Sequence, residues 1–149
     1  MMHGRRGDTL MVNGTVNPVA RVPRGLVRLR LLNGSNAREY DLAFADDRPF
    51  HWIASEAGLL EKPVELRSLR LAPGERAEIL ADFSDGRFVT LETGPDPSFP
   101  MMMGMGRGAA TQGRAGREAV IQFEPHGTAA SASFTVPDSL VAYQRSDVS

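Results

Sequence analysis

Short runs in which apolar and charged side chains alternate are the feature that most limits what this chain can fold into. Residues 27–31 read Val-Arg-Leu-Arg-Leu, so in an extended chain the apolar side chains fall on one face and Arg28 and Arg30 on the other. This pattern predicts a half-buried strand. The alternation recurs at residues 40–44 and 77–83, and two further strands are expected at residues 88–92 and 119–123.

Turn-forming residues separate these runs. Asn-Gly or Asp-Gly pairs occupy positions 13–14, 33–34 and 85–86, and residues 72–75 read Ala-Pro-Gly-Glu. Pro73 presets its own φ and Gly74 tolerates φ above zero, which favours a type II turn. We therefore expect a β-hairpin that joins residues 64–71 to residues 76–83.

Helical periodicity is weak along the chain. No long window shows a sustained helical repeat, although residues 55–60 and 138–143 could each form a short helical turn. Many short strands separated by frequent turns point to an antiparallel sandwich or barrel. The predicted fold class is all-β.

The composition excludes several kinds of site and partner. The chain has 149 residues and no cysteine, which excludes disulfides, cysteine-type zinc sites, iron–sulfur clusters and the thiolate of a blue-copper centre. The 17 basic and 18 acidic side chains nearly cancel, so neither nucleic acid nor anionic lipid is favoured as a partner. No apolar run reaches the roughly 18–20 residues that span a bilayer, and no signal peptide is recognisable.

Polar residues form no recognisable catalytic set. Glu56, Glu61 and Glu65 occur singly on a polar stretch, which predicts a solvated face rather than an acid–base pair. Serine, histidine and aspartate residues occur without a nucleophile-elbow pattern. Residues 13–15 and 33–35 match the N-glycosylation acceptor, but their Asn-Gly pairs favour turns. No catalytic or cofactor-binding residue is predicted.

The histidines are too scattered to build a copper cluster. His3, His51 and His126 lie far apart in the sequence, and none belongs to a His-x-His pair. His51 follows Pro49 and Phe50 in a strand-like, largely apolar segment, where a lone histidine is expected to be a hydrogen-bonded structural residue. No metal site is predicted from these residues.

Residues 94–116 differ from the rest of the chain in composition. They are rich in glycine, proline, methionine and arginine and are predicted to be a flexible loop. Thioether sulfur favours Cu(I), so weak cuprous-ion binding is one hypothesis, and an apolar loop that packs on a neighbouring domain is the preferred one. The candidate ligands are Met101, Met102, Met103 and Met105.

Arginines gather on the predicted sheet. Cross-strand pairs of opposite charge stabilise a sheet, so pairing with carboxylates within the sheet is the preferred hypothesis over docking of another domain. The arginines are Arg28, Arg30, Arg67, Arg70 and Arg76, and the expected partners are Glu65 and Glu78.

Several motifs together resemble the second cupredoxin domain of three-domain multicopper oxidases. The similarity covers residues 7–93 and weakens to general character beyond residue 94. It is carried by Gly-Asp-Thr-Leu-Met-Val-Asn-Gly at 7–14, by residues 22–38, by Arg-Pro-Phe-His at 48–51, by Gly-Leu-Leu at 58–60 with Pro63 and Val64, and by residues 71–79.

This resemblance implies a Greek-key β-sandwich that is mostly antiparallel. In such oxidases the first and third domains hold copper and the second is a spacer, so the resemblance implies a domain without its own copper or catalysis. Residues 1–125 would form the cupredoxin-like domain and residues 126–149 a linker toward a following domain. The implied partners are flanking cupredoxin domains of the same chain, and the isolated fragment could self-associate.

The parent protein is left open between two classes. One is a laccase-like multicopper oxidase that oxidises a phenol or Cu(I) and reduces dioxygen to water. The other is a copper-free scaffold of the cell-division or envelope type. A third hypothesis is a Cu(I)-binding module that acts through the methionines. The resemblance places the parent in the periplasm or outside the cell.

Overall fold

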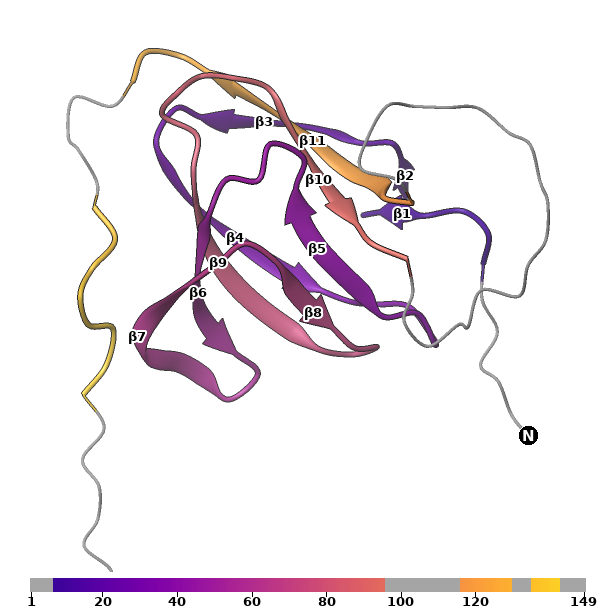
Figure 1. Cartoon of the computed structure of the whole chain (residues 1–149), viewed down its shortest axis with the longest axis horizontal. Helices are drawn as coiled ribbons and strands as arrows, with labels where there is room; N and C mark the ends of the chain where they lie inside the picture. Colours follow the sequence, from indigo (N-terminus) through magenta and orange to yellow (C-terminus); the bar gives the residue numbers. More distant parts are fainter. Residues whose placement is uncertain (1–6, 96–115, 130–134, 143–149) are drawn as a thin grey trace, which may run out of the picture.

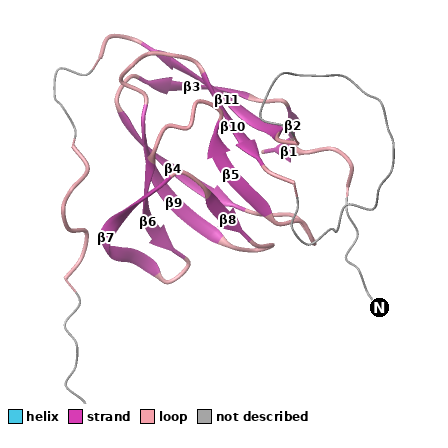
Figure 2. Cartoon of the chain, in the orientation of Figure 1, coloured by secondary structure: helices cyan, strands magenta, loops and turns pink. Residues whose placement is uncertain are grey.

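All regular structure that is described consists of strands (Figure 2). The computed structural model describes residues 7–95, 116–129 and 135–142. Its strands are β1 (Met11–Val12), β2 (Thr15–Val16), β3 (Val19–Pro23), β4 (Leu26–Leu32), β5 (Tyr40–Phe44), β6 (Phe50–Ser55), β7 (Gly58–Leu66), β8 (Leu69–Leu71), β9 (Arg76–Asp82), β10 (Val89–Thr93) and β11 (Glu118–His126). Within the described ranges there is no helix that could cross a membrane.

The strands form two main sheets (Figure 1). One has the order β3-β11-β10-β5-β8 and the other β4-β9-β6-β7, while β1 and β2 form a separate pair. All neighbouring strands are antiparallel except β3 and β11, which are parallel. The prediction of an all-β, mostly antiparallel, cupredoxin-like sandwich is therefore confirmed.

A cluster of phenylalanine rings joins the two sheets. Phe44 of β5 lies 5.9 Å from Phe50 of β6 and 6.1 Å from Phe83, measured between ring centroids, with both pairs edge to face. Phe123 of β11 lies 5.1 Å from Phe83. Because each such pair contributes about 0.5–1.5 kcal/mol beyond simple burial, this cluster fixes how the sheets pack.

The alternation seen in the sequence decides which face of β4 is buried. Val27, Leu29 and Leu31 pack against the core, and Arg28 and Arg30 are exposed on the opposite face. Strand β4 pairs with β9 along its whole length. The strand prediction for residues 27–31 is thus confirmed, as is the one for residues 40–44.

The predicted hairpin through residues 72–75 is wrong, although the turn itself forms. The Glu75 amide donates to the Ala72 carbonyl at 3.0 Å, and Gly74 has φ of 84°. However, β8 pairs with β5 in one sheet, and β9 pairs with β4 and β6 in the other. The turn therefore crosses between sheets instead of closing a hairpin.

A buried asparagine explains why the chain crosses at this point. Asn33 is 3% exposed, and its side-chain amide donates to the carbonyl groups of Arg38 at 2.8 Å and Leu71 at 2.9 Å. Its side-chain oxygen accepts from the amide and hydroxyl of Ser35. Its backbone also bonds the turn, accepting from Gly74 at 2.8 Å. Asn33 thereby ties the end of β4 to β8 of the opposite sheet.

Both expected helical turns are wrong in the described residues. Residues 55–60 form the tight connection between β6 and β7, in which Ser55 is paired with Gly58 across two turn residues. Gly58 has φ of 115°, a conformation that favours glycine over a helical path. Residues 138–142 are irregular, and the Leu140 amide donates to the Glu61 carbonyl on β7 at 2.9 Å. Tyr143 lies outside the described residues.

Replacement of Asn33 tests whether its hydrogen bonds hold the two sheets together. Asn33→Ala removes the side-chain donor to the Leu71 carbonyl and one of the two donors to the Arg38 carbonyl, which keeps the Ser35 hydroxyl at 2.8 Å, so we expect the free energy of unfolding to fall by about 2–4 kcal/mol. Urea unfolding followed by Trp52 fluorescence measures it. Asn36→Ala, at an exposed position three residues away, is the control and should change stability by less than about 0.5 kcal/mol. An equal loss of unfolding free energy in the two variants would contradict this role of Asn33.

Candidate functional site

The histidines in the described residues do not converge on a metal site. His51 lies on β6 with its Nε2 3.7 Å from a Glu65 carboxylate oxygen, and His126 ends β11 in the other sheet. Across residues 7–95, 116–129 and 135–142, no group of three or more histidine, cysteine, aspartate or glutamate side chains could hold a metal. The candidate thioethers Met101, Met102, Met103 and Met105, together with His3, lie outside the described residues.

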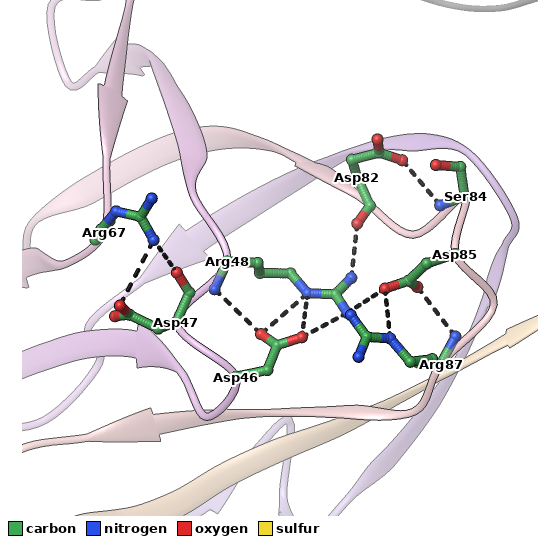
Figure 3. Close-up of polar contacts among 8 residues, drawn as sticks. All are labelled: Asp46, Asp47, Arg48, Arg67, Asp82, Ser84, Asp85 and Arg87. Carbon is green, nitrogen blue, oxygen red and sulfur yellow. Dashed lines mark hydrogen bonds and ion pairs between the residues drawn. The ribbon is translucent and has the colours of Figure 1, made fainter.

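An ionic cluster around Arg48 occupies the end of the sandwich where β5 turns into β6 (Figure 3). The Arg48 side chain is 10% exposed. Its Nη2 donates to Asp46 at 2.7 Å and to Asp85 at 2.9 Å, and its Nη1 donates to the Asp82 carbonyl at 2.7 Å. One guanidinium therefore fixes the β5–β6 turn against the loop that follows β9.

The same guanidinium covers the aromatic cluster. Its central carbon lies 6.0 Å from the ring centroid of Phe44 and 5.7 Å from that of Phe83. A planar cation over an aromatic face stabilises the fold by about 0.5–2 kcal/mol, depending on how far the cation is desolvated. Arg48 thus closes the end of the core as well as bonding the loops.

The carboxylates of the cluster are held in their charged form. Burial alone would raise the pKa of Asp46, but hydrogen bonds from the Arg48 side chain and backbone and its charge outweigh burial, so the pKa is lowered. The pKa of Asp85 is also lowered, because hydrogen bonds from Arg87 and the charges of Arg48 and Arg87 outweigh burial. The pKa of Arg48 is raised, since these partners outweigh its desolvation. Such carboxylates are poor general bases.

Further pairs extend the cluster over the neighbouring loops. Arg67, just after β7, contacts the carbonyl and carboxylate of Asp47, and Arg87 Nε donates to Asp85 at 3.1 Å (Figure 3). The Asp82 carboxylate accepts from the Ser84 amide at 2.8 Å. These contacts indicate an end that is fixed by ion pairs and hydrogen bonds, a structural site rather than a reactive one.

A second arginine, Arg117, holds the chain where β10 ends and β11 begins. Arg117 donates to the Asp41 carbonyl at 2.9 Å, and its Nε lies 3.7 Å from a Glu92 carboxylate oxygen. The side chains of Arg117 and Glu92 are each 14% exposed. The Gly94 amide also donates to the Asp41 carbonyl, at 2.9 Å. Both strand ends are therefore bound to the same residue of β5.

The outer face of the β4–β9 ladder carries the predicted arginine–carboxylate pairs in part. Glu78 accepts from both Arg28 and Arg30, the latter at 3.1 Å, so this pairing is confirmed. The proposed role of Glu65 as an arginine partner is wrong, because Glu65 contacts His51 instead. Arg70 lies on β8 in the opposite sheet and does not join the ladder.

A separate open groove of about 740 Å³ lies between β4, β1 and the inner face of the β3–β11–β10 sheet. Its walls include Leu29, Leu31, Leu91, Ile121 and Phe123. Met11 and Leu32, which also line it, are 56% and 58% exposed. The sandwich is thus closed by charges at the Arg48 end and open along β4.

Two sheets packed over an aromatic core in this order define a cupredoxin-like domain of the kind found in multicopper oxidases. Among solved structures, the laccase-like multicopper oxidase CueO from Ochrobactrum sp. superposes with a TM-score of 0.78 at 34% identity, covering 98% of this chain and 30% of that one. The multicopper oxidase McoA from Aquifex aeolicus has a TM-score of 0.77 at 33% identity, over 97% of this chain and 30% of its own. The resemblance to this family is confirmed.

Two of the relatives found among curated proteins are named as cell division proteins, not as oxidases. Cell division protein FtsP of Proteus mirabilis is 53% identical over 96 residues, which are 64% of this chain and 20% of the relative. FtsP of Escherichia coli K12 is 53% identical over 88 residues, 59% of this chain and 19% of the relative. The chain thus spans about a fifth of the length of the curated relatives that it matches. No family model matches the chain.

Removal of the Arg48 charge tests the ionic cluster. Arg48→Met keeps a long apolar stem but leaves Asp46 and Asp85 without their shared cation. We expect the free energy of unfolding at neutral pH to fall by about 2–3 kcal/mol, less than for a fully buried pair because both carboxylates are partly exposed. Arg70→Met, at an exposed position on β8, is the control and should change stability by less than about 0.5 kcal/mol.

The pH dependence of this difference checks its electrostatic origin. The lowered pKa values of Asp46 and Asp85 give stability that is present above the unfolded-state pKa of about 3.9 and is lost as the pH falls through the folded-state values. The gap between the parent chain and Arg48→Met should therefore shrink below about pH 4. Urea unfolding as a function of pH measures it, and a gap that stays constant on acidification would refute the assignment.

Proposed function

We propose that this chain is a copper-free structural domain that orients neighbouring domains of a longer multicopper-oxidase-like protein. The observation that supports this proposal is the extent of the structural match: 98% of this chain superposes on 30% of a laccase-like oxidase. The buried charges of the described residues are used to hold loops and strand ends, as the Arg48 and Arg117 contacts illustrate. Residues 1–125 would form the domain, residues 126–149 would lead to the next one, and the partners would be flanking domains of the same chain.

We further propose that the parent is a scaffold of the cell-division or envelope type, acting in the periplasm. Cell division protein FtsP of Proteus mirabilis is 53% identical over 64% of this chain, whereas the oxidase CueO is 34% identical over 98% of it. The second candidate is a spacer in an oxidase that oxidises phenols or Cu(I) and reduces dioxygen to water. The coverage of 98% of this chain by the CueO structure favours this candidate.

Copper content of the full-length parent separates the two candidates. After anaerobic loading with Cu(I), dialysis and reoxidation, a scaffold should retain no stoichiometric copper and consume no dioxygen with a phenolic substrate. A bacterial multicopper oxidase treated in parallel is the positive control. Retained copper with thiolate-to-copper absorbance would establish the oxidase, and this chain would then be its spacer.

The methionine hypothesis is tested on this chain by itself. We expect no Cu(I) binding tighter than micromolar in competition with a chelator, because the preferred role of these residues is packing on a neighbour. The variant with Met→Leu at positions 101, 102, 103 and 105 keeps apolar volume without thioether sulfur and should behave like the parent chain. Tighter binding that this variant loses would establish a cuprous site.

A further inference from the structure

Among the described residues, strand β4 has a hydrogen-bonded neighbour along one edge, β9, and none along the other, which is called its free edge. The Phe83 amide donates to Gly25 at 2.8 Å before the strand, and the Asn33 amide donates to Glu75 at 3.0 Å after it. Antiparallel pairs alternate between bonded and non-bonded positions, so Val27, Leu29 and Leu31 bond to β9. The amides and carbonyls of the alternate residues point away from β9. These residues are Leu26, Arg28, Arg30 and Leu32, and no described residue bonds to their backbone groups.

The free edge runs beside the apolar groove. Leu29, Leu31 and Leu32 line the groove together with Phe123 and Leu91 from the opposite sheet. A strand added to β4 would continue the inner face of its sheet, so every second side chain would enter the groove. The groove has a volume of about 740 Å³.

Charge on the outer face restricts which strand can be added. Arg28 and Arg30 are 52% and 80% exposed and share a single carboxylate, Glu78. One positive charge on this edge is therefore left without a partner in the ladder. A second copy of β4 in antiparallel register about Leu29 would place Arg28 opposite the other copy's Arg30. Like charges directly opposite each other destabilise a pair, which disfavours self-pairing.

We propose that the free edge of β4 is a docking edge for an extended protein segment whose residues alternate between aliphatic and acidic. The aliphatic side chains enter the groove, the carboxylates face Arg28 and Arg30, and the segment's backbone satisfies the unpaired groups of β4. Docking at this edge would be a role additional to the proposed structural function, and it does not depend on whether the parent carries copper. Failure of docking would therefore leave the structural role of the domain untouched.

Amide hydrogen exchange followed by NMR tests the edge directly. In the free chain, the amides of Arg28, Arg30 and Leu32 should exchange much faster than those of Leu29 and Leu31. A short synthetic peptide of alternating valine and glutamate should slow the first set selectively. A peptide of alternating valine and lysine is the control and should bind at least about fivefold more weakly.

Two variants assign binding to this edge. Arg30→Glu should reverse the preference between the two peptides, while Arg70→Glu, on β8 of the other sheet, should leave it unchanged. Arg30→Pro removes an outward amide without breaking the ladder to β9 and should abolish protection of Arg28 and Leu32. The proposal is overturned if the outward amides are already protected in the free chain, if protection depends on chain concentration, as a second copy would require, or if neither peptide changes them.

Discussion

Burial of a shared aromatic core between two half-apolar sheets is the constraint on which the rest of this structure depends. Phe44 and Phe123 come from strands of one sheet, Phe50 comes from a strand of the other, and Phe83 directly follows β9, so each sheet can bury its inner face only against the other. The registers of the strands follow, because a slip by one residue would move every inner side chain to the solvent face. The buried polar side chain of Asn33 is consequently hydrogen-bonded where β4 ends.

The Arg48 end of the sandwich is fixed by ion pairs, whereas the side along β4 is open. This difference suits a domain that positions other domains. At the Arg48 end, one guanidinium binds two carboxylates and a carbonyl and lies over two rings of the core, so the loops there are fixed. Arg117 fixes the ends of β10 and β11 on Asp41 in a similar way. Along β4, by contrast, an apolar groove adjoins a strand edge that pairs with no described strand. Rigid loops hold orientation, and an open edge offers a place for contact.

Local patterns predicted the strands well because period-two alternation is a property of the strand itself. Residues 27–31 and 40–44 were predicted for this reason, and Glu78 followed from its place opposite Arg30. The hairpin through Pro73 failed because a turn specifies a reversal but not which sheet the next strand joins. That choice rests on Asn33, which is distant in sequence. Arg48 was missed because its partner Asp85 is 37 residues away, and the only local signal was the adjacent Asp46 and Asp47.

Thermal unfolding with and without copper tests most directly whether this fold stands without a metal. The chain should unfold in one cooperative transition in the presence of a chelator, and its midpoint should not move when Cu(I) or Cu(II) replaces the chelator, since a ligand raises the midpoint only by binding the folded state. A midpoint that climbs with copper concentration, or a transition that is cooperative only when copper is present, would contradict the account.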